Sequence, residues 1–536
     1  MEGTRRTALS PMDNIMPRFY AKLIFAFRCS AQEDPAKVCS LLQDGLSRAS
    51  VDVPSIAGKV FHSTEDNVAK GALEVHTNPT WVPKIHLQDL RDVIDYDDWV
   101  DEGLPQDELD PDRFFPAIGM PDLHKGAPVF IAQANFVAGG MILAVGMFHS
   151  VIDGTSGMWL AKKWAEYTRQ LQGVATDDHA SLVISPQSTD NQLLMNLWQA
   201  EGHEAVTLDD LTHGRKGADD PSLWRLLGLD PVNPSPQPFS LDTLPDIQKP
   251  PPPVRSTIFY VSQKALAELK AAAAAAADLS DENGSTEGVN ISANDALMAL
   301  LWRAIIRARF SKNETATPRE EQTTLDTTFD GRAHFSPDLP WTYLGSLIFI
   351  STARMTISEL ISSDTPLGRI AGEVRRAANA ITTPRIHAAF GLAAALPDYN
   401  SLSFPFATFA GSEVCITSWI AWSLFDLDFG PIFRNGGRPE FLRPPRREFD
   451  PVCRRCVVLP LQTHGGCEIL VSLVSDEMSR LEADPEFSRF ASVKLPVVDP
   501  RVCSYLLNRE DAEFGPTRYV PKRPSMGVNA HGNGWS

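Results

Sequence analysis

The stretch GMFHSVIDGTSGMW, residues 146–159, decides how the chain is organised around its most reactive side chain. An apolar run precedes His149, which is therefore expected at the end of a buried strand. Thr155 or Ser156 can cap the helix that the next apolar residues predict. Asp153 and Gly154 then fall in the turn between strand and helix, where glycine permits a sharp turn and leaves room for a ligand.

Several kinds of chemistry are open to His149 and Asp153. A metal site would need a third ligand, and no neighbouring His or Cys offers one, so no metal is predicted. A serine triad would need a G-x-S-x-G turn, and the sequence has none. A neutral imidazole with a pKa of about 7 can take a proton from an attacking hydroxyl or amine, which makes His149 a candidate general base. The alternative is a half-buried histidine that only hydrogen-bonds a carbonyl.

Strands and helices alternate on both sides of this stretch, which predicts an α/β fold. Apolar runs predict strands over 20–29 and over 128–149, the latter folded as a hairpin around Gly139. Helical spacing and helix propensity predict helices over 34–49, 263–279 and 292–310. Further strands are expected at 257–262, 344–351, 413–420, 454–461 and 467–474.

The length of 536 residues predicts two or three domains. Residues 228–256, GLDPVNPSPQPFSLDTLPDIQKPPPPVRS, are rich in proline and have no periodicity, which is typical of an extended crossover. We therefore expect an N-terminal domain over 1–225, a crossover over 226–256, a C-terminal domain over 257–520 and a disordered tail over 521–536.

The composition bounds the partners. With 49 Lys and Arg against 67 Asp and Glu, the formal charge is −18, which disfavours nucleic acid and anionic membranes as partners. No run reaches the roughly 18 apolar residues of a membrane span, and no secretory signal is apparent. The seven cysteines are sparse and odd in number. These features predict a cytoplasmic protein with reduced thiols and small-molecule partners.

An ordered set of motifs resembles the BAHD acyltransferases, in particular their fungal branch that acts on secondary metabolites. HSVIDG carries the family's H-x-x-x-D-G at His149, Asp153 and Gly154, and FDLDFG (425–430) carries the start of its D-F-G-W-G signature at Asp428, Phe429 and Gly430. Four more segments resemble the family in the same order: LSPMDNIMPRFY (9–20), SANDALMALLWRAIIRAR (292–309), DGR (330–332) followed by YLGS (343–346), and TSW (417–419).

The resemblance implies two α/β domains, each like a chloramphenicol acetyltransferase subunit, with the active-site channel between them. It implies an acyl-CoA-dependent acyltransferase, with His149 as the base that deprotonates the acceptor. Asp153 is expected to be structural and paired with an arginine, for which Arg332 is the best candidate. Thr417 is expected near the reacting carbonyl, where it could hydrogen-bond the oxyanion. Asp428, Phe429 and Gly430 are expected to hold the shape of the channel.

The sequence also departs from the family. Pro431 and Ile432 stand where the signature continues with W-G, and Phe148 stands where condensation domains of peptide synthetases have a second histidine. The missing second histidine argues against a carrier-bound acyl donor. Two alternatives stay open: an enzyme that forms amides, as condensation domains do, and a non-catalytic relative that binds metabolites, which the altered sequence after Gly430 favours. We expect no permanently bound cofactor, with acyl-CoA such as acetyl-CoA as co-substrate. We also expect a monomer, because two domains in one chain already form the active interface.

Overall fold

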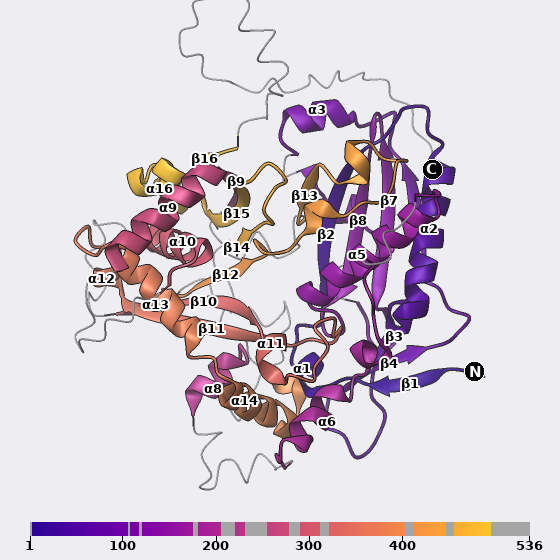
Figure 1. The fold of residues 1–536 in the computed structure, drawn as a ribbon, viewed down its shortest axis with the longest axis horizontal. Helices are drawn as coiled ribbons and strands as arrows, with labels where there is room; N and C mark the ends of the chain where they lie inside the picture. The colour runs from indigo at the N-terminus through magenta and orange to yellow at the C-terminus, as the bar shows by residue number, and fades with distance from the viewer. Residues whose placement is uncertain are drawn as a thin grey trace, which may run out of the picture.

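The computed structural model describes residues 3–104, 108–116, 121–174, 181–204, 220–230, 254–277, 290–310, 321–402, 411–445 and 455–494. These residues form three sheets with helices packed on them (Figure 1), so the predicted mixed α/β fold class is confirmed. The predicted tail over 521–536 and most of the predicted crossover lie outside the described residues. No helix in the described part of the chain is long and apolar enough to span a membrane.

The five-stranded sheet carries the strand that leads to His149. Its strands, in order across the sheet, are β13 (Phe441–Arg443), β2 (Tyr20–Arg28), β8 (Gly140–Phe148), β7 (Phe130–Val137) and β5 (Ile85–Asp89). β7 and β8 form the predicted hairpin, and the turn between them has Gly139 at a φ of +79°. Helices α2 (Pro35–Asp52) and α5 (Gly154–Gln170) pack together and share one apolar core with this sheet.

The seven-stranded sheet belongs to the second half of the chain. Its strands, in order, are β11 (Ile348–Thr356), β10 (Gln322–Asp330), β12 (Val414–Ser418), β14 (Arg455–Val458), β15 (Cys467–Val474), β9 (Val254–Val261) and β16 (Ser492–Val493). β10, β12 and β14 run parallel to one another, and the other neighbours are antiparallel. Helix α10 (Ala293–Arg309) is buried on nearly every face, packed by α9 (Gln263–Ala277) and α13 (Leu367–Asn379).

A four-stranded sheet and several short helices form the lower part of the molecule as it is drawn in Figure 1. The sheet has the order β1 (Arg5–Ala8), β4 (Leu73–Thr77), β3 (Lys59–His62) and β6 (Ala127–Pro128). A third apolar core joins α1 (Pro11–Asn14), α6 (Leu193–Ala200), α8 (Pro221–Leu226), α11 (Arg332–Phe335) and α14 (Thr383–Ala395). The remaining described α-helices are α3 (Tyr96–Asp101), α4 (Pro111–Phe114), α12 (Ile357–Ile361), α15 (Ser475–Glu482) and α16 (Pro485–Phe490).

One strand of the second half completes the sheet of the first. β13 pairs antiparallel with β2, with Leu442 opposite Phe25. The buried Arg443 at the end of β13 then forms an ion pair with Glu468 of β15, in the seven-stranded sheet. Burial alone would raise the pKa of Glu468, but the charges of Arg443 and Lys494 outweigh it and lower that pKa. The contribution of β13 to the sheet of the first half connects the two halves of the chain. The predicted division into two domains stays a prediction.

Candidate active site

His149 is the first residue after β8, and backbone contacts fix its position. Its N–H donates to the carbonyl of Phe19 at 2.9 Å, and its carbonyl accepts a long hydrogen bond of 3.5 Å from the hydroxyl of Ser346. The Phe19 ring lies edge-on to the imidazole, with 5.6 Å between the centroids. The histidine is half-buried. It is therefore not enclosed in the packed core, and these backbone hydrogen bonds hold it at the end of β8.

Asp153 begins helix α5 as its N-cap. Its carboxylate accepts from the N–H of Ser156 at 2.9 Å, and the residue is only 2% exposed. The prediction of a cap at Thr155 or Ser156 is therefore wrong. The hydroxyl of Thr155 instead donates to Asp330, at the end of β10, at 2.8 Å. The first turn of α5, which follows the His149 turn, is thus hydrogen-bonded to the second half of the chain.

Arg332 is the buried cation of this turn. Its guanidinium donates to both oxygens of Asp153, at 2.9 and 3.0 Å, and to Asp330 at 2.9 Å. It also donates to the carbonyls of Tyr343 and Gly345, at 2.9 and 2.8 Å. Burial disfavours the charged form, but the two carboxylates outweigh it and raise the pKa of Arg332. The structure thus brings together the pair that the resemblance implies.

A second buried aspartate supports the same turn, and the sequence analysis missed it. Asp13 of α1 accepts from the N–H of Ser346 at 2.7 Å, while Asp153 accepts from the next N–H, of Leu347, at 3.1 Å. Burial raises the pKa of Asp13 from its usual 3.8 to about 6, although the hydrogen bonds from Ser10 and Ser346 oppose this. A signal was present, because the sequence SPMD has the Ser-x-x-acid spacing of a capping box.

Glycine is needed at position 154 because of a packing contact that could not be predicted from the sequence. A Cβ at this position would lie 2.0 Å from the indole of Trp422, so the space that was expected to admit a ligand is filled. The ring of Trp422 stacks on Trp419 with 5.3 Å between the centroids. Trp419 follows β12, which carries the half-buried Thr417. The loop after Thr417 therefore reaches the first residue of α5.

The second motif holds the opposite end of α5. Asp428 pairs with Arg169, in the last turn of the helix, at 3.4 Å and accepts from the N–H of Gly430 at 2.8 Å. Phe429 is buried against Phe27 and Trp164, at centroid distances of 5.3 and 5.4 Å. The 17 residues of α5 span about 25 Å. The motif therefore lies one helix length from His149.

Gly430 lies in the turn that contacts the far end of α5. Its φ of +91° lies in the left-handed region that favours glycine. The amide of Gln172 donates to the carbonyl of Phe429 at 2.6 Å and accepts from the N–H of Ile432 at 2.8 Å. Ile432, which stands in place of the family's W-G, thus still contributes a backbone bond to the end of α5.

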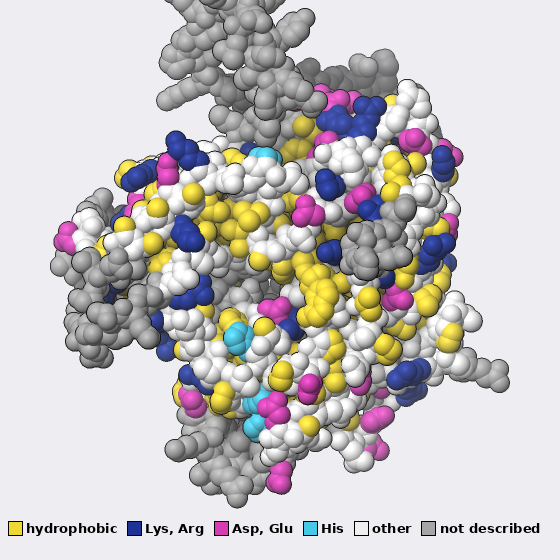
Figure 2. All heavy atoms as spheres, in the orientation of Figure 1, with side chains coloured by type: hydrophobic (Ala, Val, Ile, Leu, Met, Phe, Trp, Pro, Cys, Tyr) yellow, Lys and Arg dark blue, Asp and Glu magenta, His cyan; other side chains and the backbone are white. Residues whose placement is uncertain are grey.

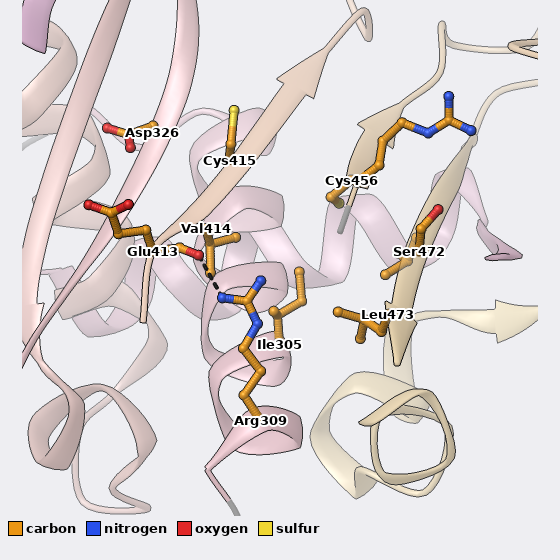
Figure 3. A pocket seen from close by; sticks show the side chains of 11 residues that line it. Ile305, Arg309, Asp326, Glu413, Val414, Cys415, Cys456, Ser472 and Leu473 are labelled. Carbon is orange, nitrogen blue, oxygen red and sulfur yellow. Dashed lines mark hydrogen bonds between the residues drawn. The ribbon is translucent and has the colours of Figure 1, made fainter. Parts of the chain in front are cut away.

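A small cavity lies elsewhere, in the seven-stranded sheet beside α10 (Figure 3). Arg309, on its wall, donates to the carbonyl of Glu413 at 2.6 Å. The cavity volume of about 30 Å³ is enough for a water molecule and far too small for a substrate. Burial raises the pKa of Cys456, which lines the cavity, so its thiol stays protonated. Cys453, three positions earlier in the sequence CRRC, lies outside the described residues.

The described basic side chains form no single cluster on the face of the molecule drawn in Figure 2. There the described Lys and Arg side chains are dispersed among acidic and apolar ones. Apolar side chains are instead gathered in patches near the middle of this face. Recognition of a large anionic ligand on it would therefore draw on separate basic residues rather than on one cluster.

Comparison with known proteins assigns the chain to a class. A family model described as the Transferase family matches residues 3–488. The chain belongs to this family, the BAHD acyltransferases, and is an acyltransferase. The resemblance inferred from the motifs is therefore confirmed.

Fungal acetyltransferases are among the relatives. Eremophilane O-acetyltransferase prx11 of Penicillium rubens is 31% identical over 500 residues, which is 90% of this chain and 98% of the relative. Trichothecene 3-O-acetyltransferase TRI101 of Fusarium sporotrichioides is 26% identical over 485 residues, covering 88% and 93%. A crystal structure of F. graminearum TRI101 with coenzyme A and T-2 mycotoxin has a TM-score of 0.69 at 22% identity, covering 91% of this chain and 99% of the other. Likeness at this identity shows the shared fold.

Proposed function

We propose that the protein transfers an acyl group, in the simplest case acetyl, from acyl-CoA to a hydroxyl of a small secondary metabolite, with His149 as the general base. The observation that carries this is the half-buried His149 on a turn that both halves of the chain hold in place. The relatives add support, since prx11 and TRI101 are named as O-acetyltransferases and TRI101 has been solved with coenzyme A.

The reaction follows from the chemistry of one imidazole. In its neutral form, the imidazole of His149 takes the proton of the acceptor hydroxyl on its unprotonated ring nitrogen while the oxygen attacks the thioester carbonyl. The tetrahedral oxyanion collapses, the carbon–sulfur bond breaks, and the imidazolium of His149 returns its proton to the coenzyme A thiolate. The hydroxyl of Thr417 is the proposed donor to the oxyanion. No proton is gained or lost overall.

Asp153 acts as a positioning residue in this scheme. Its two carboxylate oxygens accept from Arg332, Ser156 and Leu347, so their lone pairs are directed at the turn and at the second half of the chain. The aspartate therefore fixes where the His149 turn lies. The base in this scheme is the single imidazole of His149.

The test is acyl transfer by the His149→Ala variant. The full chain is incubated with acetyl-CoA and a panel of alcohols and amines, and free thiol and product mass are measured. We expect His149→Ala to lower the rate by roughly 10²–10⁴-fold. His86→Ala, at an exposed position of β5, is the matched control and should keep the parent rate.

Each other outcome has a definite meaning. A His149→Ala variant as active as the parent removes the mechanism. Products whose mass and chemistry identify amides replace O-acylation by the amide-forming alternative. Ligand binding without turnover on any acceptor favours the non-catalytic relative.

A further inference from the structure

Three side chains with metal-binding atoms meet where α6 ends against α14, in a region that acyl transfer does not use. Glu201 and His203 follow α6, and His387 lies within α14. Nε2 of His203 lies 3.0 Å from Nδ1 of His387, and a carboxylate oxygen of Glu201 lies 3.4 Å from the same Nδ1. The three ligand atoms all lie within 4.8 Å of one another.

The hydrogen bonds of His387 fix its tautomer. Its Nε2 lies 2.7 Å from the carbonyl of Phe335, and a carbonyl only accepts, so Nε2 carries the hydrogen. In the neutral ring, Nδ1 therefore presents its lone pair to His203 and Glu201. Histidines that bind metals commonly donate their other N–H to a carbonyl in this way. His387 is 3% exposed, so this orientation is held by packing.

The second ring is held as well. The indole of Trp198 stacks on His203 at a centroid distance of 5.2 Å and an interplanar angle of 15°. The indole N–H donates to the carbonyl of His387 at 3.1 Å. Trp198 thus supports both histidines from one side. Glu201 is exposed and His203 is half-buried, so an ion could enter from solvent.

The spacing suits a tetrahedral ion. Zinc–nitrogen distances of about 2.0–2.1 Å place two ligands of a tetrahedron about 3.3–3.4 Å apart. The separation of His203 and His387 is 3.0 Å and that of Glu201 and His387 is 3.4 Å, both within a few tenths of an ångström of this value. The third separation, between Glu201 and His203, is at most 4.8 Å, so the exposed carboxylate would close on the ion. Two imidazoles and a carboxylate form a donor set that Zn²⁺ favours, with a fourth position for water.

We propose that Glu201, His203 and His387 bind one Zn²⁺ ion. The site would fasten the end of α6 to α14 and, through Phe335, to α11, whose first residue is Arg332. Histidine and acidic side chains lie close together at the lower edge of the face in Figure 2, where Figure 1 shows α6 and α14. The sequence alone suggested no metal, since 184 positions separate the two histidines.

The experiment uses the full chain after treatment with a chelator and exchange into metal-free buffer. Titration with Co²⁺, followed by visible absorption, should show one equivalent bound, and Zn²⁺ should displace it. Zn²⁺ should also raise the melting temperature of the parent protein. His203→Gln should weaken binding by about tenfold or more and abolish the Zn²⁺-dependent shift, because one direct ligand is lost.

Matched controls separate the cluster from ordinary surface binding. Glu204→Gln changes an exposed carboxylate three residues from Glu201, and His334→Gln changes an exposed histidine of α11; both should bind like the parent. A parent that binds no stoichiometric Co²⁺ or Zn²⁺ overturns the proposal. So does a His203→Gln variant with unchanged affinity. A melting temperature that responds to pH but not to Zn²⁺ would make the cluster a hydrogen-bonded histidine pair instead.

Discussion

The two ends of α5 are held by the same half of the chain through different forces. At the first end, the side chains of Arg332 and Asp153 are 5% and 0% exposed and lie 2.9 Å apart. At the far end, those of Arg169 and Asp428 are 26% and 32% exposed and lie 3.4 Å apart, and the buried ring of Phe429 makes the main apolar contact. Beside His149 the fold thus uses directional charged bonds, and away from it the fold uses apolar burial.

The two kinds of contact have different effects: the buried ion pair sets the orientation of its groups, and the apolar contact contributes stability. A buried ion pair adds little net stability compared with apolar groups of the same shape, but removing one partner is costly because the other charge stays buried. Apolar burial stabilises without demanding one orientation. The first end of α5 is therefore suited to fix the turn of His149, and the far end to hold the halves together.

The largest effect is expected from Arg332→Ala, which leaves Asp153 buried without its cation. Stability should fall by about 3–5 kcal/mol, together with acyl-transfer activity, as measured by urea unfolding and steady-state rates. The double variant Arg332→Ala/Asp153→Asn should lose less stability than Arg332→Ala alone, because no charge is stranded. A single variant as stable as its parent would show that the pair does not hold the turn.

A smaller loss is expected from Phe429→Ala at the far end. Removing a ring packed on Phe27 and Trp164 should cost about 3 kcal/mol of stability. The kcat of the folded fraction should stay near that of the parent, because the ring lies one helix length from His149. A drop in kcat with unchanged stability would mean that the two ends of α5 are not separate in function.

The next effect is a dependence on pH from Asp13. Its pKa is raised from 3.8 to about 6 on folding, so the native state binds a proton more tightly than the unfolded chain. The stabilisation is fully present below the lower value and is lost as the pH rises through the higher one, with a slope of at most about 1.4 kcal/mol per pH unit.

The measurement is urea unfolding of the parent and of Asp13→Asn between about pH 4 and pH 6. Subtracting the two curves removes the contribution of the other carboxylates. The free energy of unfolding of the parent minus that of Asp13→Asn should fall as the pH rises, because only the parent loses this proton. A difference that is constant with pH would show that Asp13 titrates normally in the folded protein.

The smallest effect is expected from Asp428→Asn. The amide keeps an oxygen for the N–H of Gly430 and removes only the half-exposed pair with Arg169. We expect a loss below about 1 kcal/mol and an unchanged kcat, since partly exposed pairs are weak. A large loss of activity in a stable variant would place this motif in the chemistry.

The local elements were predictable, and the reasons are physical. Hairpin β7–β8 and helices α2, α5, α9 and α10 have patterns that depend only on nearby residues. β10 was missed because its sequence, QTTLDTTFD, alternates weakly and carries few apolar residues. β13 was missed because three residues, Phe441–Arg443, are too short to show a period.

The site was predictable only in part. The pairing of Arg332 with Asp153 followed from the family resemblance, since the two residues stand 179 positions apart. The capping-box spacing of SPMD could have marked Asp13 as part of a helix cap. Its link to the His149 turn could not be predicted, because its partner there is the backbone N–H of Ser346, and backbone donors leave no mark in the sequence. The role of Gly154 escaped notice because Trp422, which occupies the space beside it, comes from the other half of the chain.

The late position of β13 has a consequence for how the protein is made. While the first half leaves the ribosome, the edge of β2 at Ile24–Ala26 has no strand to bond, and open edges of this kind invite wrong partners. That edge of β2 stays unpaired until β13 is synthesised, late in the production of the chain. Cutting the protein within the crossover would thus yield a first fragment that stays incomplete until the second fragment supplies its missing strand.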